Sequence, residues 1–166
     1  MEANVNVTMK KEYIFDLLLY HMYSKFSGFL INMLGLSVII MGGYRLKSGN
    51  FSLMQALLFV AVGILVIIYN PLMLKIRAGK MIKLKKYQKE ISYHFSEQGI
   101  VEVIEDKENF YGWKDIKKAM TTPKNVVFYI SEQEALIVPK VSFEEKFMTV
   151  MNLIVSNMTM DRIYIR

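Results

Sequence analysis

Ionisable side chains that could perform acid–base or metal chemistry are few and scattered in this sequence. His94 stands in an apolar run without a carboxylate at the spacing of a metal-ligand set, and the chain has no cysteine, so no zinc site is predicted. Two close carboxylates could act as general acid and base. The acids that come nearest to this surround a predicted hairpin, which favours a solvated turn: Glu102, Glu105, Asp106 and Glu108. Phosphate-binding loops, serine-hydrolase elbows and zincin helices are also absent from the sequence. We therefore expect no catalytic residue, no metal and no cofactor, and a protein other than an enzyme.

The positive charge is concentrated in one short segment. The 166 residues carry a formal net charge of +6. Residues 75–89 contain no acid and hold these bases: Lys75, Arg77, Lys80, Lys83, Lys85, Lys86 and Lys89. Nucleic-acid binding usually combines bases with stacking aromatic side chains, which do not interleave with this segment. No nucleic-acid partner is predicted.

Two long uncharged stretches predict a transmembrane helical hairpin over residues 26–73. Residues 26–44 contain no charged side chain, and residues 53–73 are the densest part of a second uncharged stretch. As a helix, the first stretch would be about 28 Å long, close to the thickness of the hydrocarbon core. The short linker 45–52 requires the two helices to be antiparallel. A soluble protein would need apolar partners on every side of such helices, which the rest of the chain is too short to supply, and the first stretch begins too late for a signal peptide.

Basic residues near the ends of these spans predict the orientation. Two lie in the linker, three precede the first span, and seven follow the second, so the positive-inside rule places both termini in the cytoplasm, with a multi-pass anchor in the membrane. Residues 74–90 are expected to form a basic juxtamembrane helix. Its candidate contacts with anionic head groups of the inner leaflet are Lys80, Lys83, Lys85 and Lys86. The alternative is that these bases act only as the topology signal.

Small and polar residues recur at helical steps along the first span. Gly28, Asn32, Gly35 and Gly42 share one face, and small residues on such a face let a neighbouring backbone approach closely. We expect this face to pack on the second span. The alternative is a homodimer through the same face.

The segments outside the spans predict a small α+β domain. Residues 1–25 begin with an alternating strand pattern and continue as an interfacial helix. Residues 91–158 contain short β-type runs separated by turn residues, followed by a helix whose capping box is Ser142 and Glu145. The fold class is thus a membrane α-helical hairpin plus an antiparallel β meander or barrel that a C-terminal helix caps. The N-terminal strand could add to a sheet edge, and residues 159–166 form a tail with weak strand character.

Three short motifs resemble a known family. Phe95, Gly99 and Ile100 in HFSEQGI, Trp113, Ile116 and Lys117 in YGWKDIKK, and Ile137, Pro139 and Phe143 in LIVPKVSF resemble the C-terminal domain of the YcxB-like bacterial membrane proteins. The resemblance implies a cytoplasmic domain similar to a pleckstrin-homology barrel capped by a helix, and it brings no catalytic residue with it.

Together these features indicate a membrane-anchored binding or scaffolding module. We expect the hairpin to anchor the domain, the basic segment to hold it against the anionic inner leaflet, and an exposed surface to bind an unknown protein partner. The alternative function is an accessory subunit of a transporter or of an envelope-stress sensor that acts through the transmembrane hairpin.

Overall fold

The structure is a computed structural model that describes residues 1–24, 26–132 and 134–165. The predicted segments 1–25 and 159–166 each end on a residue outside that description, Lys25 and Arg166. The chain divides into two compact units, which we call the globular unit (residues 1–17 and 79–166) and the hairpin unit (residues 18–78). Each is described by itself below.

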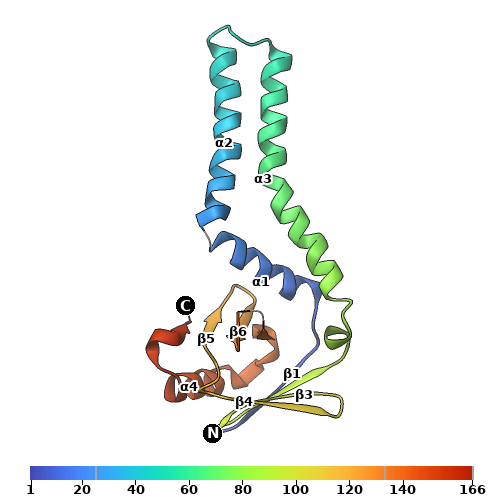
Figure 1. Ribbon diagram of the computed structural model, residues 1–166, viewed down its shortest axis with the longest axis vertical. Coiled ribbons are helices and arrows are strands. Elements are labelled where there is room, and N and C mark those ends of the chain that lie inside the picture. Colours follow the sequence, from blue (N-terminus) through green and yellow to red (C-terminus); the bar gives the residue numbers. More distant parts are fainter. Residues whose placement is uncertain (25, 133, 166) are drawn as a thin grey trace. The chain divides into compact units, whose positions relative to one another are not determined.

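The hairpin unit consists mainly of two long antiparallel helices (Figure 1). Helix α1 (Lys11–Tyr23) starts in the globular unit and leads to α2 (Phe26–Lys47), which a tight turn joins to α3 (Leu53–Met81). Ser52 caps α3: its hydroxyl accepts from the Gln55 N–H at 3.4 Å, and the Gln55 side chain accepts from the Ser52 N–H at 2.9 Å. Both α2 and α3 are long and apolar enough to cross a membrane, and most of their side chains are exposed in the structure, unlike core helices of a soluble protein.

Glycines bring α2 and α3 into close contact. A Cβ added to Gly35 would lie 2.9 Å from the Gly63 carbonyl oxygen, and one added to Gly63 would lie 2.7 Å from the Gly35 carbonyl oxygen. Gly42 is in a similar position, because a Cβ added to it would lie 2.7 Å from the Cβ of Phe59. The face that contains Gly35 and Gly42 is therefore occupied by α3 of the same chain.

Two other residues of this predicted face lie differently. Gly28 lies against the C-terminal end of α1, because a Cβ there would lie 2.3 Å from the carbonyl oxygen of Met22. Asn32 is half-buried in the first half of α2.

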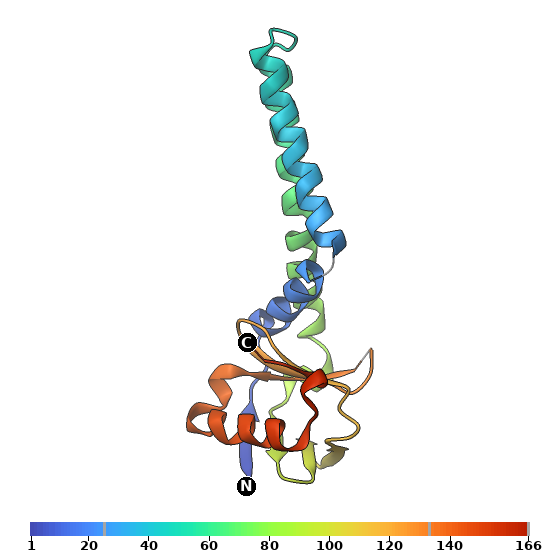
Figure 2. The same cartoon turned by 90° about the vertical axis from the view of Figure 1, so that its left-hand side faces the viewer.

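The described part of the globular unit contains two four-stranded sheets. Sheet A has the order β1-β2-β3-β4 with all neighbours antiparallel, and sheet B has the order β7-β6-β5-β8 with β8 parallel to β5. The strands are β1 (Ala3–Val7), β2 (Ile91–Phe95), β3 (Gly99–Ile104), β4 (Lys107–Gly112), β5 (Lys118–Thr121), β6 (Asn125–Tyr129), β7 (Ala135–Pro139) and β8 (Ile163–Tyr164). Figure 2 shows α4 (Phe147–Asn157) beside these strands.

Aromatic side chains connect the two sheets and the segment before α4. The Phe95 ring lies 5.7 Å from that of Phe128 and 6.1 Å from that of Phe143. All three side chains are fully buried, as are Val150 and Ile154 on the inner face of α4. This core confirms the predicted α+β class with its hairpin, its short strands and its C-terminal helix. It also confirms that the N-terminal strand adds to a sheet edge, beside β2.

Two predicted helix boundaries are wrong. Residues 74–90 do not form one helix: α3 continues through Pro71 to Met81, Leu84 is extended, and Lys85–Gln88 form a short 3₁₀ helix, η1. Helix α4 begins at Phe147 and not at the predicted capping box of Ser142 and Glu145. The cause is Glu144, whose φ of 48° is left-handed and cannot continue an α-helix.

Candidate binding site

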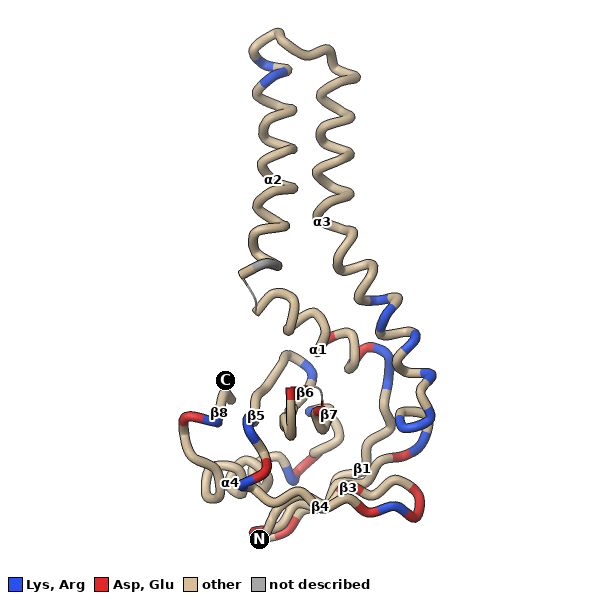
Figure 3. The backbone as a smooth tube through the Cα atoms, viewed as in Figure 1, with Lys and Arg blue, Asp and Glu red and all other residues tan. Residues whose placement is uncertain are grey.

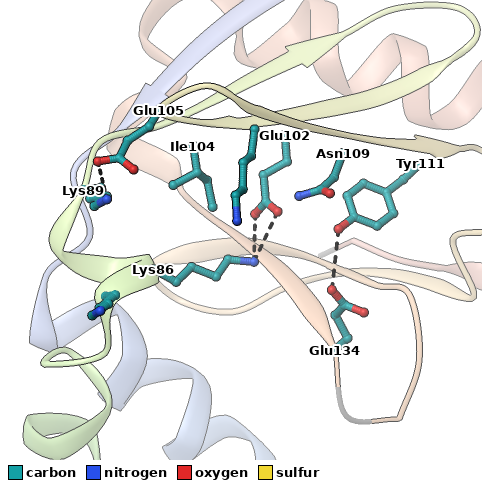
Figure 4. Close-up of a pocket in the computed structure, with 10 residues that line it drawn as sticks. Lys86, Lys89, Glu102, Ile104, Glu105, Asn109, Tyr111 and Glu134 are labelled. Atoms are coloured by element: carbon teal, nitrogen blue, oxygen red, sulfur yellow. Dashed lines mark hydrogen bonds and ion pairs between the residues drawn. The ribbon is translucent and has the colours of Figure 1, made fainter.

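A charged groove of about 410 Å³ lies in the globular unit (Figure 4). Its walls come from η1, from β3 and β4, and from the hairpin that joins β6 to β7. The lining residues are Lys85, Lys86, Lys89, Glu102, Ile104, Glu105, Lys107, Asn109, Tyr111 and Glu134.

The register of sheet A explains why this groove is polar. Side chains alternate between the two faces of a strand, so the inner face reads Val5, Tyr93, Glu102 and Asn109 across the four strands. The inner face is therefore apolar on β1 and β2, where it forms the core. On β3 it places Glu102 between Ile100 and Ile104, and on β4 it carries Lys107, Asn109 and Tyr111. Glu102, Ile104 and the residues of β4 form the floor of the groove.

Glu102 is the one acid that this floor buries almost completely, with 1% of its surface exposed. The Lys86 ammonium lies 2.9 Å from its Oε1 and 3.2 Å from its Oε2, and the Tyr93 hydroxyl donates to Oε1 at 3.2 Å. These contacts offset the cost of removing the carboxylate from water. The prediction that Glu102 belongs to a solvated turn is wrong, whereas Glu105, Asp106 and Glu108 are exposed.

The candidate lipid-binding lysines divide into two groups. Lys86 is half-buried and pairs with Glu102. Lys80 and Lys83 are exposed and lie outside the groove, and Lys85 is exposed and lines it. Figure 3 shows the bases gathered at the end of α3 and in the segment that follows.

Two of the four lysines that line the groove are not neutralised by a neighbouring acid. The other two are paired, Lys86 with Glu102 and Lys89 with Glu105 at the rim. Among the described residues, neither the Lys85 nor the Lys107 side chain has a hydrogen-bond or ion-pair partner. The groove therefore offers two uncompensated cations. At the end of β4 opposite Lys107, the Tyr111 hydroxyl donates to Glu134 at 3.5 Å.

The buried carboxylate also affects the tyrosines around it. Burial, and then the negative charge of Glu102, raise the pKa of Tyr93 well above its usual value. Burial raises the pKa of Tyr111 to about 12, with further contributions from the charges of Glu102 and Glu134. Both phenol hydroxyls therefore keep their protons, and remain hydrogen-bond donors, to a higher pH than an ordinary tyrosine does.

The raised pKa of Tyr111 predicts a loss of stability in alkali. Below pH 10, the ordinary pKa of tyrosine, the folded and unfolded chains both hold the proton, and the contribution of Tyr111 to stability is complete. Between pH 10 and about 12 the unfolded chain releases the proton first, so stability falls. Ultraviolet difference titration should lose a late tyrosinate transition in Tyr111→Phe, and Glu134→Gln should lower its midpoint. A transition that Tyr111→Phe leaves unchanged would contradict this assignment.

A second polar cluster, outside the groove, holds the start of α1. Asp16 Oδ2 accepts from the Thr122 hydroxyl at 2.5 Å, from the Lys124 N–H at 3.1 Å and from the Asn125 amide at 2.9 Å. The Asn125 amide also donates to the Tyr13 carbonyl oxygen at 3.0 Å. No local pattern marks this cluster, because Asp16 is more than a hundred positions away from its three partners. It fixes the first turns of α1 to the β5–β6 turn.

The histidine considered for metal binding lies elsewhere, on the outer face of sheet A. His94 contacts Asn4, and its Nε2 lies 3.9 Å from Glu2. Within the part of the chain that the structure describes, no group of three His, Cys, Asp or Glu side chains could hold a metal ion.

Apart from the exposed Lys117, the residues that carry the family resemblance are buried. Phe95, Ile100, Ile116 and Phe143 are fully buried. Gly99 permits a close backbone contact, since a Cβ there would lie 2.2 Å from the Tyr111 carbonyl oxygen. The motifs therefore specify the fold of the domain rather than the chemistry of its groove.

Comparisons with known proteins give one match. The chain matches no curated protein and no solved structure. The family model that matches covers the end of β2, β3 to β7 and the first part of α4. The resemblance is thus confirmed: residues 95–151 match the family described as YcxB-like protein.

Proposed function

We propose that this chain is a two-span protein of the bacterial inner membrane whose globular unit is a cytoplasmic binding or scaffolding module. The observation that carries the proposal is the groove above sheet A. It combines free cationic donors at Lys85 and Lys107 with an acceptor at Glu134, on a floor that the buried Lys86–Glu102 pair makes rigid. Such a surface suits recognition of a polar segment of a partner protein.

Binding is favoured over catalysis by the state of Glu102. It is the groove's buried carboxylate, and a general base must be able to reach the proton it removes. Both of its oxygens are instead engaged by Lys86 and Tyr93. Its geometry supports a structural role.

The basic residues that follow the second span support a cytoplasmic location of the globular unit. The bases of residues 75–89 follow the second span directly, whereas the linker holds only Arg45 and Lys47. The positive-inside rule then places the globular unit in the cytoplasm. There, the exposed Lys80 and Lys83, together with Lys85, lie on the chain close after the span and would attract anionic head groups by roughly 1 kcal/mol each.

Reporter fusions to the C-terminus test this orientation. They should be active in the cytoplasm, and activity in the periplasm would overturn the cytoplasmic placement of the globular unit.

Site-specific photocrosslinking in living cells tests the binding role. A photoreactive amino acid at Asn109, in the groove, should form a discrete adduct with one protein, which mass spectrometry of the adduct identifies. The same amino acid at Lys114, exposed outside the groove, should not form it. Absence of the adduct from Asn109 would overturn the binding role. Adducts that form only from exposed hairpin positions such as Leu65 would favour an accessory subunit that acts through its spans.

A further inference from the structure

Strand β4 is an open edge of sheet A. It pairs with β3 along one side, and no strand of the described chain pairs with its other side. An open edge presents a row of backbone N–H and C=O groups to which another strand can add. The groove lies along this same strand, because every second residue of β4 lines it: Lys107, Asn109 and Tyr111.

Edge strands often carry charged residues that prevent another strand from pairing with them. Strand β4 follows this pattern only in part. Lys107 and Glu108 fit it. Phe110 does not, because 59% of this large apolar side chain is exposed. It faces away from the groove beside its cross-strand neighbour Val101, where it offers an added strand an apolar contact. An exposed phenylalanine in the middle of an open edge favours docking over protection.

The charges of the groove are ordered along β4. At the Lys107 end, Lys107 is uncompensated, whereas Glu105 is neutralised by Lys89. Asn109, in the middle, is neutral. At the Tyr111 end the wall is acidic, because Tyr111 contacts Glu134. A strand added to β4 would therefore meet a cation, an amide and a carboxylate at successive alternate positions.

We propose that an extended segment of a partner protein adds antiparallel to β4 as a fifth strand of sheet A. From its N-terminal end, its groove-facing residues are a base opposite Tyr111, a neutral polar residue opposite Asn109 and an acid opposite Lys107. The residue opposite Phe110 is apolar. The inference rests on the proposed binding function and names its partner's chemistry. A lipid head group fits less well, because three carboxylates also line the groove.

Two peptides of identical composition test the charge order. The first contains Lys-Val-Gln-Thr-Glu, and the second exchanges its ends to give Glu-Val-Gln-Thr-Lys. Fluorescence anisotropy with the full chain in phosphatidylcholine nanodiscs should show about tenfold tighter binding of the first peptide, since two favourable ion pairs become repulsive in the second. The double variant Lys107→Glu/Glu134→Lys should reverse this preference. Equal binding of the two peptides, tighter binding of the second, or no saturable binding of either would overturn the proposal.

N-methylation tests whether the peptide binds as a strand. In strand addition only alternate backbone N–H groups face the sheet, so methylating one alternate set of peptide nitrogens should abolish binding and methylating the other set should not. Equal effects of both sets would overturn strand addition, even if crosslinking from Asn109 still supported a binding function.

A last experiment tests whether the groove binds lipid instead, by repeating the peptide titration in nanodiscs that contain phosphatidylglycerol. If that lipid displaces the first peptide from the parent chain but not from Lys107→Gln, the groove is a lipid site and the proposal is wrong.

Discussion

Replacing Lys86 by methionine should destabilise the globular unit by about 2–4 kcal/mol, because it leaves the Glu102 carboxylate buried without its cation. Lys86 retains 35% of its side-chain exposure, which keeps the expected loss below that of a fully buried pair, while Glu102 is 1% exposed. Methionine preserves most of the aliphatic length of lysine. The loss therefore reports the missing charge rather than missing packing.

Lys89→Met is the matched control for this substitution. Lys89 lies in the same segment and also pairs with a glutamate, but both side chains of that pair are substantially exposed. Exposed pairs contribute little, so the control should cost no more than about 0.5 kcal/mol. Adding Glu102→Gln to Lys86→Met should recover much of the stability, since glutamine carries no charge and can still accept from the Tyr93 hydroxyl.

The measurement can use the chain's own fluorophore. Trp113 is its single tryptophan; it is 4% exposed and donates its indole N–H to the Ser96 carbonyl oxygen at 2.9 Å. Urea unfolding of the full chain in mild detergent, followed by Trp113 emission, therefore reports the globular unit. Equal midpoints for Lys86→Met and Lys89→Met would show that the buried pair does not stabilise the fold.

The elements of the fold were predictable because their signals are local. Two runs without charge identify α2 and α3, and alternation in ANVNV identifies β1, which indeed pairs with β2. The wrong boundaries have tertiary or conformational causes. Lys86 belongs to a short 3₁₀ helix that meets β3 sixteen positions later, and Glu144 is left-handed. Neither feature changes the pattern of polar and apolar residues nearby.

The groove was less predictable, although one local signal was present. In GIVEVI, Glu102 falls on the same side of the strand as Ile100 and Ile104, which places an acid on an inward face. The three acids that follow it near the turn led instead to the prediction that Glu102 is exposed to solvent. The partner of Glu102 could not be found this way, because Lys86 is one of seven bases in residues 75–89 and nothing in the sequence distinguishes it from the others. Asp16 and Asn125, 109 positions apart, illustrate the same limit.

The two polar contacts that the sequence did not reveal have a common consequence. The chain passes between its two units through α1 and through the end of α3. Within the globular unit, Asp16 fixes α1 to the β5–β6 turn, and Lys86 fixes the segment after α3 to β3. Both connections are thus attached to a sheet, and the one through Lys86 is attached at the groove.

Gly35→Val should disrupt the hairpin unit, with a loss of about 2–3 kcal/mol, because the added side chain has no room between the helices. Its Cβ would lie 2.6 Å from Ile67 Cγ1 and 2.9 Å from the Gly63 carbonyl oxygen. The isoleucine can change its rotamer, but the backbone oxygen belongs to the opposite helix and cannot move without separating α2 from α3. The same reasoning predicts a comparable loss for Gly63→Val, whose Cβ would approach the Gly35 carbonyl oxygen.

Gly43→Val is the control, since it makes the same change in the same helix where no atom lies within 4 Å of the added Cβ. Because the chain has no cysteine, donor and acceptor dyes can be placed on cysteines introduced at the exposed Phe29 and Leu72, near the end of the hairpin opposite its turn. Energy transfer during titration with sodium dodecyl sulfate should be lost earlier in Gly35→Val than in Gly43→Val. Coincident curves, together with conversion of a dimer to a monomer by Gly35→Val, would instead place this glycine face between two copies of the chain.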